Sequence, residues 1–450
     1  MDSLYEVSNK THEVSNLEIT AKSFSGRYGT KKNVGDIIHV SLNISNIVSN
    51  NNNKEIIFLI DISGSMSSSM KAVISSMLAF RDAILQKTPQ EMEALTKEER
   101  DNLIRQINMR VITFSNSAKE VWSFQSPYNY EETIKGLSCE ALTNMGDALK
   151  LAFSKISPQK FTWIVAMTDG LSNSGPCRTA SSFQKLVTCH KPLHTKIISL
   201  GYGTEFDPET LNQIGSFVHV EDSEMIPVVL ANIAEEFALS VSFNCVVDVP
   251  DREINEFDEE TIIVPDGESK TVGKVIVGDR VLGSLISGKE YNYVYLPHGN
   301  NLSDIQKYNT VVVRYTDIES LETVIRSVKI EHTQSEPTPD LVKMYFQSES
   351  KRLIYSLYRA IQKGNIKKEI PRVQKILEGW SPTEVNEEKE AVLKLIEDIL
   401  KKDEKKVASM ALNQAVGNNY STPSFHGYSL ATMISADYYM TSPTINDQLN

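Results

Sequence analysis

Hydrophobic and polar residues follow different patterns along the chain, and these patterns divide it into regions. Residues 54–238 hold short apolar runs, such as the unbroken run Ile56–Ile60 and the largely apolar Phe161–Met167, which are typical of strands buried on both faces of a parallel sheet. Between the runs, apolar residues recur at helical spacing, as from Ser68 to Thr88. Strands that alternate with helices predict a doubly wound, Rossmann-like α/β domain, with a parallel sheet that helices cover on both faces.

The regions on either side alternate between apolar and polar positions, which predicts half-buried strands. Residues 16–50 form the first block and residues 240–333 the second. The expected strands are Leu17–Ala21, Ile37–Ile44, Phe243–Val249, Lys274–Val281, Asn292–Leu296, Val311–Tyr315 and Val324–Ile330. The first block is too short to bury a core of its own. We therefore expect one β-sandwich built from both blocks, with the α/β domain inserted in it. A separate sandwich on each side is the alternative.

The last part of the chain returns to helical spacing. Residues 339–415 predict a small helical bundle, and residues 416–450 form a tail rich in Tyr, Ser and Thr. Residues 1–15 are an N-terminal arm. The expected helices are Leu341–Ile361, Ile366–Glu378, Glu387–Lys401 and Glu404–Gln414. The pattern as a whole therefore predicts a multidomain chain.

The first apolar run leads into a group of oxygen-bearing side chains. Asp61, Ser63 and Ser65 follow it at a spacing of two residues, at the carboxyl end of a strand, where open α/β sheets bind ligands. Such hard oxygen ligands suit Mg²⁺ or Mn²⁺ better than a soft metal. Gly64 allows the tight turn that lets both hydroxyls face one point. The simpler alternative is a turn followed by a helix N-cap.

This D-x-S-x-S sequence resembles the metal-ion-dependent adhesion site of von Willebrand factor A (VWA) domains. The resemblance implies further metal positions on two other loops, and residues of the right type stand there. Thr143 precedes a predicted helix, and Asp169 follows the buried run Phe161–Met167. Where family members often have two glycines, this chain has Ala141 and Leu142, which predicts a stiffer loop. The implied metal positions are Asp61, Ser63, Ser65, Thr143 and Asp169.

The resemblance implies a binding module rather than an enzyme. In the family, the two serines and the threonine contact Mg²⁺, or Mn²⁺ or Ca²⁺ in its place, while the aspartates act directly or through water. An Asp or Glu of a protein partner fills the open coordination position. The sequence has no Walker A loop, nucleophile elbow or metalloprotease motif. Two alternatives stay open: a structural component of a large assembly or particle with a vestigial metal site, and a substrate-recruiting partner of a ubiquitin ligase.

Charge and composition narrow the expected partners and location. The 450 residues carry a net charge of −12, which argues against binding nucleic acid by neutralising phosphates. No segment is long and apolar enough to span a bilayer, and Met1–Glu6 lacks the features of a signal peptide. We therefore expect a cytoplasmic or other intracellular protein, or one packaged in a particle from an intracellular pool. The sequence does not predict an oligomeric state.

The cysteines also suit a reducing compartment, because the chain has four and they are scattered. Zinc is an alternative for Cys177, Cys189, His190 and His194, which lie in one short segment. The segment lacks the closely spaced cysteine pair of ordinary zinc sites. Free thiols and surface histidines are therefore the expectation.

Overall fold

A computed structural model describes residues 17–26, 35–45, 53–85, 87, 89–140, 142–169, 172–192, 194–202, 206–220, 226–248, 280–295, 310–333, 335, 337–362, 364–380 and 386–401. Several of the sequence-based expectations lie outside these residues. They are the N-terminal arm (1–15), positions 274–279 of an expected strand, the helix Glu404–Gln414 and the tail (416–450).

The centre of the molecule is a six-stranded sheet in the order β5-β4-β3-β6-β7-β8. Neighbouring strands are parallel except for β4 and β5. Every residue of β3 and β6 is buried, which is why both strands are largely apolar in sequence. The strands are β3 (Lys54–Asp61), β4 (Met109–Phe114), β5 (Ala118–Ser123), β6 (Phe161–Thr168), β7 (Thr195–Tyr202) and β8 (Ser216–Val220).

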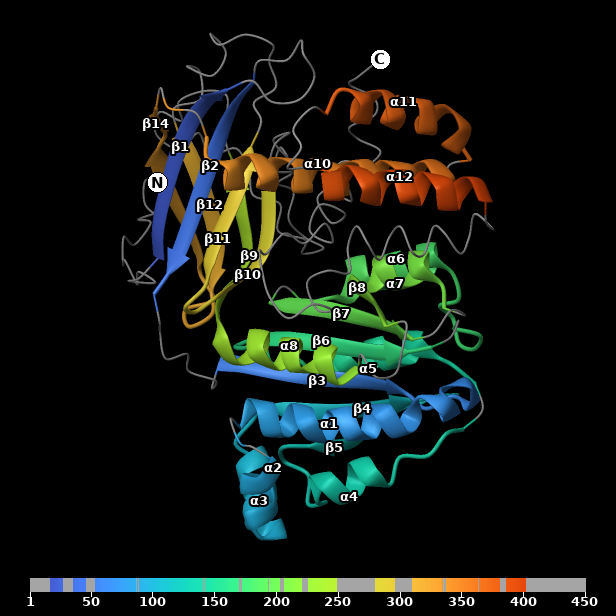
Figure 1. The fold of residues 1–450 in the computed structure, drawn as a ribbon. Coiled ribbons are helices and arrows are strands. Elements are labelled where there is room, and N and C mark those ends of the chain that lie inside the picture. Colours follow the sequence, from blue (N-terminus) through green and yellow to red (C-terminus); the bar gives the residue numbers. More distant parts are fainter. Residues whose placement is uncertain are drawn as a thin grey trace, which may run out of the picture.

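Helices cover both faces of this sheet, as the alternating pattern predicts (Figure 1). Ile57 and Leu59 of β3 share one hydrophobic cluster with α5 (Met145–Lys155), α6 (Ala180–His190) and α7 (Pro208–Ile214). The intervening Ile56, Phe58 and Ile60 share a second cluster with α1 (Met70–Ile84), α4 (Tyr130–Lys135) and α8 (Ile226–Leu239). Successive side chains of a strand point to opposite faces, so one buried strand supplies both clusters.

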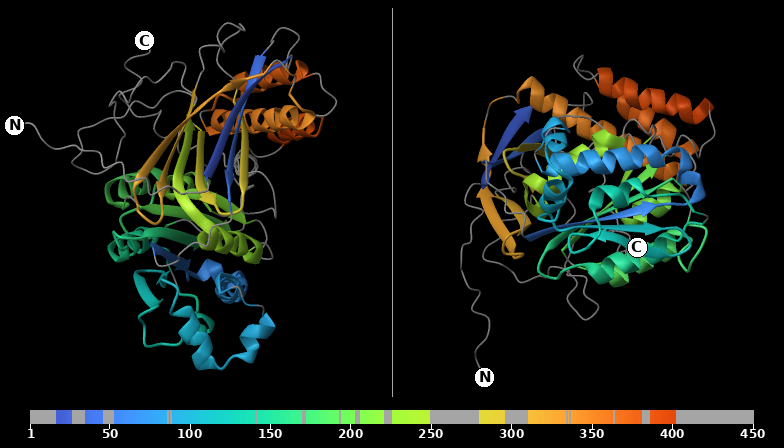
Figure 2. Two further views of the ribbon diagram at one scale, coloured as in Figure 1. Left: turned by 90° about the vertical axis from the view of Figure 1, so that its left-hand side faces the viewer. Right: turned by 90° about the horizontal axis from the view of Figure 1, so that it is seen from below.

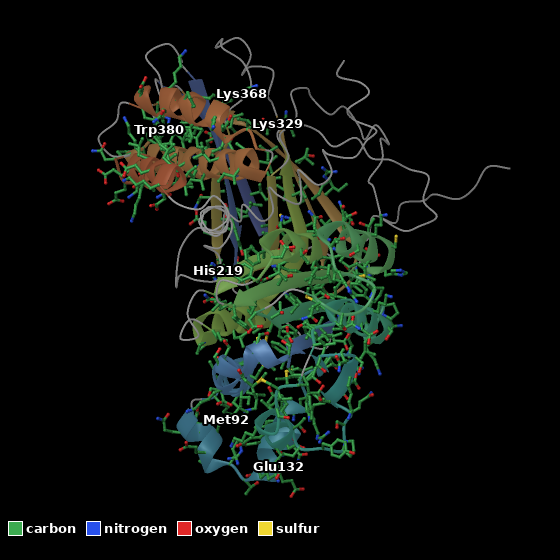
Figure 3. All side chains as sticks on the ribbon, turned by 90° about the vertical axis from the view of Figure 1, so that its right-hand side faces the viewer. Met92, Glu132, His219, Lys329, Lys368 and Trp380 are labelled. Atoms are coloured by element: carbon green, nitrogen blue, oxygen red, sulfur yellow. The ribbon has the colours of Figure 1, made fainter. Side chains whose placement is uncertain are left out.

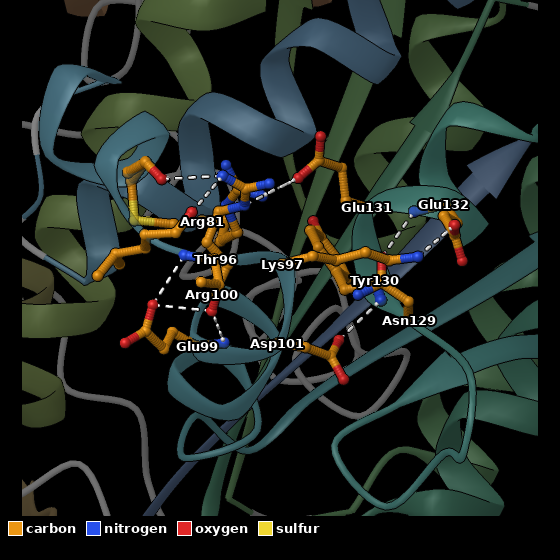
Figure 4. A network of polar contacts seen from close by, with 12 residues as sticks. Arg81, Thr96, Lys97, Glu99, Arg100, Asp101, Asn129, Tyr130, Glu131 and Glu132 are labelled. Carbon is orange, nitrogen blue, oxygen red and sulfur yellow. Dashed lines mark hydrogen bonds and ion pairs between the residues drawn. The ribbon is translucent and has the colours of Figure 1, made fainter.

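Two short helices, α2 (Pro89–Ala94) and α3 (Lys97–Ile104), form an excursion between α1 and β4 that the apolar pattern did not predict. Figures 1 and 2 place it at the end of the molecule away from the outer sheets. Polar contacts hold it (Figure 4). Thr96 and Glu99 form a capping box at the start of α3. Arg100 donates to the carbonyls of Met92 and Leu95 and pairs with Glu131 of α4.

Strands from both flanks of the central domain join in the same outer sheet. One four-stranded sheet has the order β11-β2-β1-β14, and a second has the order β10-β9-β12-β13. Their apolar residues, among them Val40, Leu42, Val247 and Val313, form one buried cluster. The strands are β1 (Leu17–Gly26), β2 (Gly35–Ile44), β9 (Ser240–Asp248), β10 (Arg280–Ile286), β11 (Glu290–Tyr295), β12 (Thr310–Asp317), β13 (Thr323–Lys329) and β14 (Glu331–His332).

Three helices follow the outer sheets: α10 (Pro339–Gln362), α11 (Ile366–Glu378) and α12 (Asn386–Lys401). Phe346 and Trp380 pack edge to face among them. In Figure 3, Trp380 marks this helical region and Met92 marks the opposite end of the molecule. The start of α10 packs on the first outer sheet, where Leu341 and Val294 are buried together. None of the helices in the described residues is long and apolar enough to cross a membrane.

The outer sheets lie at one end of the central sheet, and the carboxyl ends of its parallel strands lie at the other. The chain enters β3 beside the outer sheets, and α8 returns there to continue directly into β9 (Figure 1). The carboxyl ends of β3 and its parallel neighbours therefore point away from the outer sheets. The oxygen-rich residues that follow these strands lie at that free end.

Candidate metal centre

Asp61 and Asp169 come together because their strands are neighbours. Strand β3 pairs with β6 in parallel, with Ile60 opposite Met167. The residues that end the two strands therefore lie side by side at one edge of the sheet. Asp61 is fully buried, and Asp169 is partly exposed. One carboxylate thus forms the floor of the site, and the other lies nearer to the solvent.

Hydrogen bonds hold both oxygens of the Asp61 carboxylate. The backbone N–H of Ser63 donates to Oδ1 at 2.8 Å. The hydroxyl of Thr168, which is also fully buried, donates to Oδ2 at 2.6 Å. A carboxylate bound on both oxygens cannot rotate freely, so Asp61 is fixed before any ligand arrives.

The two serine hydroxyls continue this polar chain toward the solvent. The Oγ atoms of Ser63 and Ser65 lie 3.1 Å apart. Ser65 Oγ donates to Asp169 Oδ1 at 2.8 Å. Ser65 belongs to a single 3₁₀ turn, η2 (Gly64–Ser68). At Gly64 an added Cβ would lie 3.3 Å from the carbonyl oxygen of Glu140. The loop therefore packs closely against the segment that leads to Thr143.

Thr143 is buried on a neighbouring loop that its backbone holds in place. Its N–H donates to Oδ1 of Asn173 at 2.9 Å. Its carbonyl accepts from the backbone N–H groups of Asn173 and Ser174 at 3.0 and 3.1 Å. The next residue, Asn144, caps α5 through its side chain and donates its N–H to the carbonyl of Ser115, which follows β4. The Thr143 loop is thus tied on both sides, to β4 and to the loop after β6.

The structure brings four of the five expected metal positions, Asp61, Ser63, Ser65 and Asp169, into one connected set of hydrogen bonds. It places the fifth, Thr143, on an adjoining loop. Sequence reasoning missed two supporting residues, Thr168 and Asn173. Thr168 could have been noticed, because it is the last residue of the strand beside β3. Asn173 gave no signal, since only the folded loop brings its side chain to Thr143.

Burial makes both carboxylates harder to ionise. It raises the pKa of Asp61 to about 6, against the opposing hydrogen bonds from Thr168 and Ser63, and the nearby Asp169 raises it further. Burial also raises the pKa of Asp169, with the bond from Ser65 opposing. Two buried carboxylates close to each other are destabilised when both are ionised. A cation between or beside them would stabilise their ionised forms. The electrostatics of the site therefore suit a divalent ion.

The donor set is made of hard oxygens, which suits Mg²⁺, Mn²⁺ or Ca²⁺. In the part of the chain that the structure describes, no group of three or more His, Cys, Asp or Glu side chains could hold a metal ion. A cation at this site therefore depends on the hydroxyls as well as on the carboxylates. Ser63, Ser65 and Thr143 supply them.

The residues of the zinc alternative form no metal-holding group in the described part of the chain. Cys177 is buried and packs closely on Gly146 of α5, whereas Cys189 is exposed on α6. The ring of His194 packs edge to face on Phe243, with the ring centroids 5.8 Å apart. All four cysteines are free thiols.

One comparison with known proteins bears on the central domain, and two others bear on the fold of most of the chain. Residues 55–227 match the sequence model of a family described as von Willebrand factor type A domain. The chain is similar to VWA2, the ArnB paralog from Sulfolobus acidocaldarius, with 16% identity, a TM-score of 0.50, and 90% of this chain and 100% of that chain covered. It is also similar to a von Willebrand factor type A protein from Catenulispora acidiphila, with 15% identity, a TM-score of 0.52, and 91% and 97% covered. At these identities the likeness shows the fold alone. No curated protein matches the chain.

Proposed function

Residues 55–227 are a von Willebrand factor type A domain, and from this premise we propose that the protein is a metal-dependent module that binds an acidic residue of a protein partner. VWA domains are in general protein-interaction modules, and they commonly bind a divalent metal at a metal-ion-dependent adhesion site. In this chain, we propose that the residues that bind the metal ion are Asp61, Ser63, Ser65, Thr143 and Asp169.

The observation that carries the proposal is the run of hydrogen bonds from buried Asp61, through Ser63 and Ser65, to Asp169. Ser63, Ser65 and Thr143 would hold Mg²⁺, with Asp61 and Asp169 in support. The bound ion would supply a positive charge that attracts a carboxylate. Asp61 and Asp169 alone would repel the same carboxylate, so partner binding should require the cation.

The proposal assigns no catalytic role to the chain. The proposed role of the Ser63 and Ser65 hydroxyls is to ligate the ion. We also propose an intracellular location, which is supported by the four free thiols. We interpret the two outer sheets as a β-sandwich into which the VWA domain is inserted, since their apolar faces share one core.

Isothermal titration with Mg²⁺ and Mn²⁺ tests the metal site directly. We expect one ion per chain, and loss of binding in the double variant Asp61→Ala/Asp169→Ala. Ser68→Ala is the matched control, because Ser68 is exposed at the end of the same turn and takes no part in the proposed ligation. Equal metal uptake by the double variant and the unmodified protein would contradict the proposal.

Partner binding is tested by affinity purification from the native source, with and without EDTA. The expected partner is lost in EDTA and is lost with Thr143→Ala. Losing a buried, charge-assisted contact costs about 2–5 kcal/mol, or roughly thirtyfold or more in affinity. A partner that stays bound in EDTA and tolerates Thr143→Ala would favour a structural role in an assembly instead.

A further inference from the structure

Leu142 is an exposed apolar residue at the rim of the metal centre. Its side chain is 46% exposed, and in the described part of the chain only Tyr128 and Leu400 are large apolar residues of comparable exposure. A single exposed leucine is ordinary on a protein surface. The position of Leu142 is what matters, because it directly precedes Thr143.

Leu142 and Thr143 are neighbours on the same loop that differ in exposure. Thr143 is buried and Leu142 is exposed, and neither belongs to a helix or strand. Consecutive Cα atoms are about 3.8 Å apart, so Leu142 lies within one residue of a proposed metal ligand. A partner carboxylate that bound an ion held by Thr143 would therefore place its own chain neighbours close to Leu142.

The described residues of the loop after Asp61 offer such a partner little apolar surface. On the 3₁₀ turn that carries Ser65, the exposed residues are Gly64, Ser65, Ser67 and Ser68. These are small and uncharged. Leu142 is thus the one large apolar side chain that the described parts of these two loops present to the solvent.

The loop also holds Leu142 in position. The bonds of Thr143 to Asn173 and Ser174 fix the backbone on one side of it. The N–H of Glu140 donates to the carbonyl of Ile62 two residues before it. A contact group on a fixed backbone loses little conformational entropy when a partner binds. The leucine at this place, where VWA relatives often have glycine, can therefore contribute affinity that a glycine cannot.

We propose that Leu142 is a specificity-determining residue of the metal centre. It selects partners in which the metal-bound Asp or Glu stands next to a branched apolar residue. This inference rests on the proposed function, because it takes the metal-bound carboxylate as the anchor and adds the chemistry of the neighbouring position.

Two blocked synthetic peptides, Gly-Leu-Asp-Gly and Gly-Ser-Asp-Gly, test the inference by NMR titration of the full chain in Mg²⁺. Burial of part of a leucine side chain should favour the Leu-Asp peptide by about five- to tenfold. Leu142→Ser should reduce this ratio to about one while Mg²⁺ affinity and the melting temperature stay unchanged. Leu400→Ser removes another exposed leucine, at the end of α12, and should keep the full preference.

The outcomes separate this inference from the proposed function. If the Mg²⁺-loaded protein binds both peptides equally, or if Leu142→Ser keeps the preference, the role of Leu142 is overturned and the metal-dependent module stands. If neither peptide binds the Mg²⁺-loaded protein, or if binding persists in EDTA, the proposed function fails and the inference falls with it.

Discussion

The ammonium group of Lys54 donates a hydrogen bond to the carbonyl oxygen of Phe237 at 2.9 Å, and so joins the first residue of β3 to the end of α8. A second bond of the same length reaches the carbonyl of Ala238. These carbonyls belong to the last turn of a helix, where C=O groups lack partners within the helix and favour a cation. Lys54 therefore closes the point where the chain enters and leaves the VWA domain.

The buried position of Lys54 predicts a pH dependence of stability. Burial lowers the pKa of Lys54 from 10.5 to about 7. Between these values the unfolded chain holds more protons than the folded one, so stability rises with pH across the window. Below pH 7 burial of the charged Lys54 lowers the free energy of unfolding by its full amount, and above pH 10.5 it no longer lowers it.

Lys54→Met removes this titration. As the pH rises from 7 to 10, we expect the melting temperature of the unmodified protein to increase relative to that of Lys54→Met. The corresponding change in the free energy of unfolding is at most about 1.4 kcal/mol per pH unit. Calorimetry of both proteins over this range provides the measurement. Parallel curves would show that Lys54 titrates at its ordinary pKa in the folded protein.

Glu236 ties the VWA domain to the second outer sheet. Its buried carboxylate pairs with Lys196 of β7 and accepts from Ser284 of β10 at 2.7 Å. Glu236→Gln would remove the carboxylate charge that faces the Lys196 ammonium, at a cost on the order of 3 kcal/mol. Thermal unfolding measures this cost.

The neighbouring residue provides the control for this variant. Glu235 pairs with Lys289 at 3.0 Å, and both side chains are nearly half exposed. Surface pairs contribute about 0–1 kcal/mol, so Glu235→Gln should change the melting temperature little. Similar losses in the two variants would mean that burial of Glu236 is not what makes its contact strong.

The elements that could be predicted from the sequence are those with strong apolar patterns. The run Ile56–Ile60 predicts β3, and the helical spacing of 341–361 predicts α10 within two residues at its start (Pro339–Gln362). The excursion α2–α3 was missed because Lys97–Ile104 has only two apolar residues, both at its end. Its one local signal is the capping box of Thr96 and Glu99, which fixes the start of a helix but not its existence.

The residues of the site also divide into those that local sequence patterns predict and those that depend on the fold. Asp61, Ser63 and Ser65 are close in sequence and follow a buried strand, so their convergence could be predicted from local pattern. Asp169 needed the pairing of two parallel strands, which periodicity does not specify. The contact of Asn173 with Thr143 depends on the path of two loops, and no local pattern encodes it.

Asn173 should tune metal affinity by positioning Thr143. Asn173→Ala removes the acceptor for the Thr143 N–H, a hydrogen bond worth about 0.5–1.5 kcal/mol. We expect Mg²⁺ affinity to fall by roughly two- to tenfold. The melting temperature should change little, since Asn173 is exposed.

Asn173→Asp is the matched control, because it keeps an acceptor oxygen at the same position. Its Mg²⁺ affinity, measured by titration calorimetry, should equal or exceed that of the unmodified protein. If Asn173→Ala binds Mg²⁺ as tightly as the unmodified protein, the loop does not need this bond to present Thr143.

Leu42 tests whether the two flanks of the VWA domain fold as one unit. It is fully buried in β2, in register with Ile19 of β1 and Tyr291 of β11, and it shares a core with Val311 and Val313 of β12. Leu42→Ala should cost about 2–5 kcal/mol through lost burial and a residual cavity. Because the core is shared, the loss should reach strands that lie far away in the sequence.

Hydrogen exchange resolves this effect strand by strand. In Leu42→Ala we expect faster exchange in β2 and also in β12 (Thr310–Asp317), with little change in β3 or β6 of the VWA sheet. Asn43→Ala, at the exposed neighbouring position, should leave all four strands within about 0.5 kcal/mol of the unmodified protein. Faster exchange in β2 alone would mean that the two flanks form separate units, each with its own stability. Faster exchange in both outer sheets would instead mean that the two flanks share one stability. The first flank would then reach its full stability only together with the second flank, which follows the VWA domain in the chain.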